Sequence, residues 1–156
     1  MSSGDDFGRT SQPHDREVTL YLIKQVELAV RNALDEVVAT AGLTATQYTA
    51  LTVLERHPGT TCAELARSSF VRAQTMAEVV VRWLDRGLVT RQLDSRNRRQ
   101  YRLHLAPSGR QILNDLAQDV AAIESRMLDG FDTGQIEILG NYLLRCRQSL
   151  SSKPLR

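Results

Sequence analysis

The stretch from Arg72 to Leu105 constrains the fold most, because an amphipathic helical pattern runs directly into two strand patterns. In its first part, apolar residues recur three and four positions apart, which predicts a helix over about Arg72 to Arg86 with one buried face. These apolar residues are Met76, Val79, Val80 and Trp83. Gly87 comes just after the helical pattern, where glycine commonly ends a helix.

Two strand patterns follow this helix and enclose a polar tip. The first reads VTRQL, the second QYRLHL, and the tip between them DSRNRR. The second strand alternates between two faces. One face carries Tyr101, Leu103 and Leu105, and the other carries Gln100, Arg102 and His104. The pattern predicts a β-hairpin with an arginine-rich tip.

A shorter helix precedes the amphipathic one. It begins with a capping box, in which the Thr61 hydroxyl accepts from the Glu64 amide and the Glu64 side chain accepts from the Thr61 amide. Another capping box, Thr44 with Gln47, is predicted at the start of the helix before it. The turn SSF separates the two helices. The order helix, turn, helix and hairpin is that of a winged helix-turn-helix, whose second helix is built to lie in a major groove of DNA.

The segment from Leu65 to Leu113 resembles the MarR family of bacterial transcriptional regulators, and the flanking helices extend the resemblance over nearly the whole chain. The similar features are ELA in the first helix of the motif, QTM and RGLV at the two ends of the second, the Asp- and Arg-rich wing, and Gly109 two residues after Pro107. Three positions depart from the family pattern: Asn97 replaces a second wing Asp, Leu105-Ala106 replaces Leu-Thr, and Arg72 replaces a Ser-type cap.

The resemblance implies a twofold dimer in which the first, fifth and sixth helices interlock. It also implies a repressor released by a small molecule, because many members bind aromatic acids or phenolic compounds between the dimer helices and the winged unit. Three residues are candidates for such a pocket: Arg16, Tyr21 and Tyr48. Each of them also suits a plain core or surface position.

The predicted fold is mainly α with a small β-hairpin wing. We expect a disordered tail over residues 1–12, a winged helix-turn-helix domain over 44–105, and a helical dimerisation region over 13–43 and 106–156. In this last region helices are predicted over about 14–40, from Pro107 for about five turns, and from Asp132 or Thr133 to about Leu150. Their apolar stripes are wide, which favours burial against a second copy of the chain over a monomeric bundle.

Charge is distributed unevenly along the chain. From Arg56 to Arg102 there are ten arginines and four acidic residues, a net charge of +6, whereas the remainder carries −4. A basic block inside an otherwise acidic chain is typical of a nucleic-acid-binding face. The alternative is a solvated surface that happens to favour arginine.

The residues predicted to contact double-stranded DNA lie on the second helix of the motif, on the wing and in the turn. On the helix they are Arg72, Ala73, Gln74, Thr75, Glu78 and Arg82; on the wing Asp94, Arg96, Arg98 and Arg99; and in the turn, as phosphate contacts, Ser68 and Ser69. Gln74 can bind an adenine edge through two hydrogen bonds, and Glu78 can accept from a cytosine amine. Alternatively, Glu78 pairs with Arg82 one turn on. Asp94 is expected to brace a neighbouring arginine.

Other functions have less support in the sequence. No run reaches the ~18 apolar residues of a membrane span and the N-terminus has no signal-peptide pattern, so we expect a cytoplasmic protein. No metal or cofactor motif is present, and three scattered histidines without an acid cluster argue against an enzyme. Two alternatives stay open: a redox-responsive regulator using Cys62, whose pKa a helix N-terminus can lower, and a winged-helix adaptor that binds protein instead of DNA.

Overall fold

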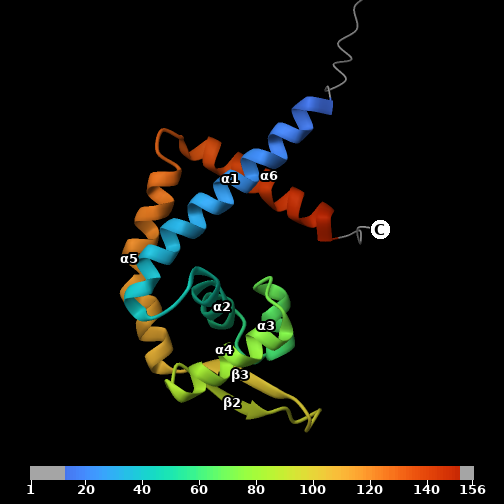
Figure 1. The fold of residues 1–156 in the computed structure, drawn as a ribbon, viewed down its shortest axis with the longest axis vertical. Helices are drawn as coiled ribbons and strands as arrows, with labels where there is room; N and C mark the ends of the chain where they lie inside the picture. Colours follow the sequence, from blue (N-terminus) through green and yellow to red (C-terminus); the bar gives the residue numbers. More distant parts are fainter. Residues whose placement is uncertain (1–12, 152–156) are drawn as a thin grey trace, which may run out of the picture. The chain divides into compact units, whose positions relative to one another are not determined.

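The computed structural model describes residues 13–151, with side chains described from residue 18 to residue 150 (Figure 1). The predicted tail over residues 1–12 and the side chain of Arg16 therefore lie outside the described residues. The chain divides into two compact units, residues 1–117 and 118–156.

The described chain is mainly helical with one small antiparallel sheet, as predicted. The helices are α1 (Pro13–Val38), the 3-10 helix η1 (Ala39–Ala41), α2 (Ala45–Arg56), α3 (Cys62–Ser68), α4 (Ala73–Asp85), α5 (Pro107–Met127) and α6 (Thr133–Ser151). The strands are β1 (Thr60–Thr61), β2 (Val89–Leu93) and β3 (Tyr101–Leu105), in the order β1-β3-β2. β2 and β3 form the predicted hairpin, with Val89 opposite Leu105 and Leu93 opposite Tyr101.

The sequence patterns predicted two strands, and β1 is a third. It pairs Thr60 with Leu103 and Thr61 with Arg102 on the other edge of β3. Two residues are too short to show an alternating pattern, and Thr61 also caps α3. The strand is therefore set by its partner β3 and not by a local signal.

The helix ends follow the predicted local chemistry. Capping boxes are present at Thr44 with Gln47 and at Thr61 with Glu64. Gly87 has φ 69°, its amide donates to the Leu84 carbonyl, and the Leu88 amide donates to the Trp83 carbonyl. This pair of hydrogen bonds is a Schellman motif, so Gly87 ends α4 as expected.

The core of the first unit lies between α2, α3, α4 and the sheet. Its largest fully buried side chains are Trp83, Leu51, Leu54, Leu65, Met76 and Val38. The start of α5 also belongs to this core, because Leu113 and Leu116 are buried. Gly109 allows the start of α5 to pack closely on the backbone at Leu88, because a Cβ at Gly109 would lie 2.2 Å from the Leu88 carbonyl oxygen.

Two side chains tie the C-terminal end of α4 to neighbouring helices. The Arg86 guanidinium donates to the Ala41 carbonyl over 2.8 Å and to the Gly42 carbonyl over 3.2 Å, next to the end of α1. The Ser108 hydroxyl, in the first turn of α5, donates to the Gly87 carbonyl. These contacts fix the direction in which α4 leaves the core.

Large apolar side chains are exposed in both units. On α1 they are Val18, Leu20, Tyr21, Leu22, Ile23, Val26 and Leu28, and on α6 they are Ile136, Ile138, Tyr142, Leu143, Leu144 and Leu150. No single helix of the described chain is long and apolar enough to cross a membrane. Among the described residues, only Val18–Ala41 and Ala45–Arg56 taken together have the length and composition of a membrane span, and a bend of 78° separates them. The second of these helices buries Leu51 and Leu54 in the core.

Candidate nucleic-acid interface

α4 turns one face into the core and the other to solvent. Its buried residues are the four predicted ones, Met76, Val79, Val80 and Trp83. All six residues predicted to contact DNA, Arg72, Ala73, Gln74, Thr75, Glu78 and Arg82, are exposed. Arg72 is the N-cap residue and makes no capping hydrogen bond with its side chain. No ion pair joins Glu78 to Arg82 within the described residues, so both side chains are available on the outer face.

The wing tip is ordered by short polar contacts of Asp94 and Asn97. Asp94 is 6% exposed and accepts from the Arg96 amide over 2.9 Å. Its carboxylate also pairs with the Arg102 guanidinium, at 2.8 Å to Nη2 and 2.9 Å to Nε. Asp94 thus braces an arginine, as expected, and that arginine is Arg102 of β3 and not one of the tip. Because the Asp94 carboxylate is buried and already engaged, the predicted DNA contact is corrected for Asp94.

Asn97, which departs from the second wing aspartate that the resemblance implies, supports the tip through its amide oxygen. That oxygen accepts from the Arg99 amide over 3.1 Å, and the Asn97 carbonyl accepts from the Gln100 amide over 2.9 Å. An asparagine can make both contacts as well as an aspartate can. The turn therefore keeps its shape without the second carboxylate.

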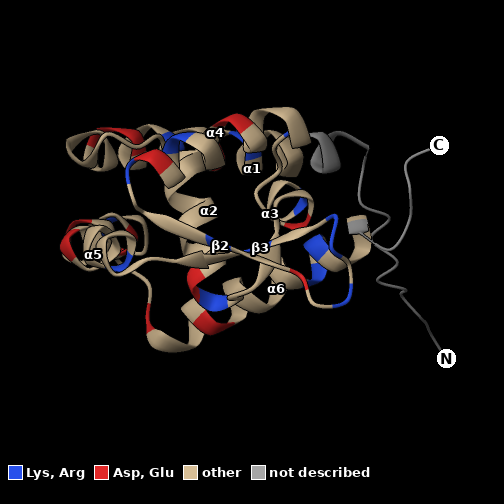
Figure 2. Cartoon of the chain, turned by 90° about the horizontal axis from the view of Figure 1, so that it is seen from below, with Lys and Arg blue, Asp and Glu red and all other residues tan. Residues whose placement is uncertain are grey.

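The three tip arginines are exposed, and Figure 2 shows basic residues along the connection between β2 and β3. Within the described chain, the salt bridges found do not include Arg96, Arg98 or Arg99. Sequence reasoning missed a further cation, Arg91, whose guanidinium lies 4.8 Å from the centre of the Tyr101 ring. Arg91 is exposed on β2, so the hairpin presents cations along its length as well as at its tip.

The pKa of the Asp94 carboxyl is held below its usual range, first by the hydrogen bond from the Arg96 amide and then by Arg102. A lowered folded-state pKa adds stability above the unfolded-state pKa of about 3.9, and that stability is lost as the pH falls. Asp94→Asn should therefore lower the thermal midpoint at neutral pH, and the gap to the wild type should narrow below about pH 4. Thermal melts of both proteins across this range test it; parallel curves would mean that the carboxylate does not brace the wing.

The two serines of the turn differ in exposure. Ser68 is exposed, whereas Ser69 is 5% exposed and its buried hydroxyl has no hydrogen-bond partner. Ser69 caps α3 through its backbone amide, which donates to the Leu65 carbonyl. A phosphate cannot reach the Ser69 hydroxyl in this structure, so the predicted phosphate contact is corrected for Ser69 and stays a prediction for Ser68.

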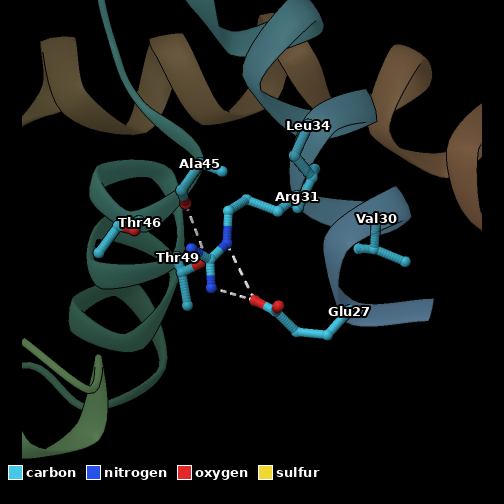
Figure 3. Close-up of a pocket in the computed structure, with 7 residues that line it drawn as sticks. All are labelled: Glu27, Val30, Arg31, Leu34, Ala45, Thr46 and Thr49. Carbon is cyan, nitrogen blue, oxygen red and sulfur yellow. Dashed lines mark hydrogen bonds and ion pairs between the residues drawn. The ribbon is translucent and has the colours of Figure 1, made fainter. Parts of the chain in front are cut away.

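A pocket of about 290 Å³ lies between α1 and α2 (Figure 3). Its lining residues are Glu27, Val30, Arg31, Leu34, Ala45, Thr46 and Thr49. The Arg31 guanidinium pairs with the Glu27 carboxylate, with Nε at 2.9 Å from Oε1. Of the predicted candidates, Tyr21 and Tyr48 are not among the lining residues. The sequence gives little indication that Arg31 lines a pocket, because the pocket forms only when α2 packs on α1.

The cysteines give no support to thiol chemistry. Burial raises the pKa of the Cys62 thiol, whereas the sequence suggested that the helix N-terminus would lower it. Cys62 is half-buried at the start of α3, and the cost of burying a thiolate outweighs the stabilisation of the thiolate by the helix N-terminus. Cys146 is exposed on α6. Among the described residues no group of His, Cys, Asp or Glu could hold a metal ion.

An exposed polar α4 after a tight turn, followed by a basic hairpin, defines the class of winged helix-turn-helix DNA-binding proteins. Residues 41–100 match the model of the MarR family. The HTH-type transcriptional repressor Rv2887 of Mycobacterium tuberculosis is 30% identical over 108 residues, which are 69% of this chain and 78% of that protein. The chain therefore belongs to the MarR family, whose members are DNA-binding transcriptional regulators and not enzymes.

Solved structures agree on the fold. A MarR transcriptional regulator from Methanosarcina mazei superposes with a TM-score of 0.76 at 21% identity, over 88% of this chain and 99% of that one. The transcriptional repressor CouR, bound to a 23-mer DNA duplex, has a TM-score of 0.74 at 25% identity, over 93% of this chain and 99% of that one.

Proposed function

We propose that the protein is a homodimeric repressor that reads a pseudo-palindromic operator with α4 and the wing and is released by a small anionic ligand. The observation that supports this most is the outer face of α4, on which Gln74, Thr75 and Glu78 are exposed between Arg72 and Arg82. Within the described residues no ion pair includes Glu78. The similarity to the repressor Rv2887 supports repression over activation, and the similarity to the repressor CouR, bound to a DNA duplex, supports double-stranded DNA as the partner.

In this proposal base contacts and phosphate contacts come from different elements. Gln74 and Glu78 offer hydrogen-bonding groups suited to base edges in a major groove. Arg72, Arg82 and Ser68 flank them and contact phosphates, which fix the register of the helix on the duplex. The wing arginines Arg96, Arg98 and Arg99 enter the adjacent minor groove or bind the phosphates beside it. Ala73, at the first position of α4, is small enough to let the helix end approach the DNA.

The dimer in the proposal rests on the apolar surface of α1 and α6. Leu22 and Tyr21 on α1 are 55% and 63% exposed, and Tyr142 on α6 is 59% exposed. A large apolar patch exposed on a helix marks an interaction site in a protein. A second copy of the chain is the partner that family membership supports, and a twofold arrangement presents two equivalent α4 helices.

The effector in the proposal is an aromatic or phenolic acid bound in the pocket between α1 and α2. Arg31 supplies a guanidinium that can hold a carboxylate by two hydrogen bonds, in exchange for its present partner Glu27. Thr46 and Thr49 add hydroxyl groups, and Val30 and Leu34 add apolar walls for a ring. Ligand binding there would act on α1 and α2 together, and hence on the position of α4.

Selection of bound fragments from genomic DNA tests the proposal as a whole. We expect recovered fragments to share a pseudo-palindrome whose half-site centres lie about 10 bp apart, roughly one helical turn. Addition of an aromatic acid should then release the DNA. Recovery of no common sequence, with the protein folded, would refute the proposal and favour a winged-helix adaptor that binds protein.

Gln74→Ala should relax base preference at one position in each half-site. A lost bidentate contact costs about 1–3 kcal/mol of discrimination against the wrong base. Competition binding with operators that carry each base at each position measures this. If affinity falls equally for all sequences, Gln74 contacts a phosphate and the base-reading role is wrong. Gln111→Ala, at an exposed glutamine of α5 that is not among the predicted DNA contacts, serves as the matched control.

A further inference from the structure

Phe70, in the turn between α3 and α4, is exposed to an unusual degree. Its relative exposure is 91%, the highest of the large hydrophobic side chains described. It is also the one residue other than glycine in the described chain with positive φ, at 56°. A bulky side chain in this conformation is a genuine outlier, because the left-handed region crowds Cβ against the backbone.

The turn itself does not require a phenyl ring. The Phe70 amide donates to the Arg67 carbonyl over 3.3 Å and the Val71 amide to the Ala66 carbonyl over 2.9 Å. These are the two hydrogen bonds of a Schellman motif, in which the left-handed residue is usually glycine. The same motif ends α4, and there the residue is Gly87 with φ 69°. Glycine would thus satisfy the turn after α3 with less strain.

Phe70 also contributes little to the core, since nine tenths of it faces solvent. A ring that serves neither the turn nor the core is best explained by a contact outside the chain. Its surroundings indicate the partner. Phe70 lines a groove with Arg72, Thr75 and Arg82 of α4 and with Arg31 and Gln47, and no acidic residue lines it. A basic groove that continues the outer face of α4 suits DNA better than an apolar protein surface.

We infer that Phe70 is a DNA-contacting residue whose ring packs on the C5-methyl group of a thymine at the edge of each half-site. This rests on the proposed function, in which the outer face of α4 meets a major groove. The thymine methyl is the apolar group exposed there, and a phenyl ring is among the side chains that contact it. The ring would offer thymine a larger apolar surface than the Ala73 side chain or the Thr75 methyl group of α4.

The test replaces each thymine of the operator in turn by deoxyuridine, which lacks only the methyl group. At one thymine position in each half-site, the replacement should lower the affinity of the wild-type protein for the operator about fourfold. This is the expected effect of losing the burial of one methylene-sized group. Phe70→Gly should bind the normal operator more weakly and should show no loss at that deoxyuridine. Phe70→Asn, which also tolerates positive φ, should behave like Phe70→Gly, and Phe70→Leu should keep most of the sensitivity.

Thermal melts exclude a folding defect, because Phe70→Gly should melt at the same temperature as the wild type or higher. A Phe70→Gly protein with full operator affinity would overturn the inference and leave a protein partner as the reason for the ring. Equal weakening on thymine and deoxyuridine operators would overturn the thymine contact. Failure of the wild type itself to bind any selected operator would instead overturn the proposed function, so the two failures are distinguishable.

Discussion

A chain cut after Ala117 is expected to run as a monomer and to lose at least about 100-fold in operator affinity. The cut falls at the boundary between the two compact units. It keeps Leu113 and Leu116 of α5, which are buried, whereas a cut after Leu105 would remove them with Gly109 and Ser108. The winged unit should therefore stay folded. The loss arises because two linked recognition helices bind DNA far more tightly than one.

Sedimentation and operator titration of the shortened chain measure the two effects. A full-length variant separates the loss of the dimer from the loss of chain: Leu143→Arg places a charge on the apolar side of α6, where Leu143 is 49% exposed. Asn141→Arg, on the same helix, is the matched control and should remain a dimer with full affinity. A shortened chain that still binds its operator tightly would contradict the proposed arrangement.

Features set by residues close in sequence were predicted well. The capping boxes of Thr44 and Thr61, the stop at Gly87 and the buried face of α4 each depend on contacts within about one helical turn. The start of α5 at Pro107 follows from the fixed φ of proline. These signals defined a helix-turn-helix and a hairpin, and with them the family.

Features set by distant contacts could not be predicted from local patterns. Strand β1 exists because β3 is beside it, and Asp94 pairs with Arg102 across the hairpin. Burial makes the Ser69 hydroxyl inaccessible and raises the pKa of the Cys62 thiol, and neighbours remote in sequence provide that burial. Phe70 carried a signal that was overlooked: a phenylalanine in the turn between two helices, where glycine or asparagine is usual.

Replacing the three wing arginines by alanine should make operator binding far less sensitive to salt. The logarithm of the affinity falls with the logarithm of the salt concentration by about 0.9 for each phosphate neutralised. Arg98→Ala alone should flatten this slope by about two units, one for each subunit of the proposed dimer. The triple variant should flatten it by as much as about five, and binding at physiological salt should fall by orders of magnitude.

The physical reason is that these side chains form no salt bridge with any residue that the structure describes. Asp94, the carboxylate nearest in sequence, is already engaged by Arg102 and by the Arg96 amide. Asn97 holds the tip through backbone amides, so removal of the arginine side chains leaves the turn intact. Thermal stability should change by no more than about 0.5 kcal/mol for each substitution, as is usual for exposed positions.

Operator titrations at several salt concentrations, together with thermal melts, distinguish a DNA contact from a structural role. Arg110→Ala removes one exposed arginine outside the wing, where Arg110 lies 3.8 Å from Glu55, and it should leave the slope unchanged. Arg102→Ala should act differently from the tip variants, because it removes the partner of Asp94 and so lowers the melting temperature. An Arg98→Ala protein with unchanged affinity and slope would show that the wing does not touch DNA. A large loss of stability in that protein would instead assign Arg98 a structural role, since an electrostatic contact at an exposed tip weakens binding and leaves the fold intact.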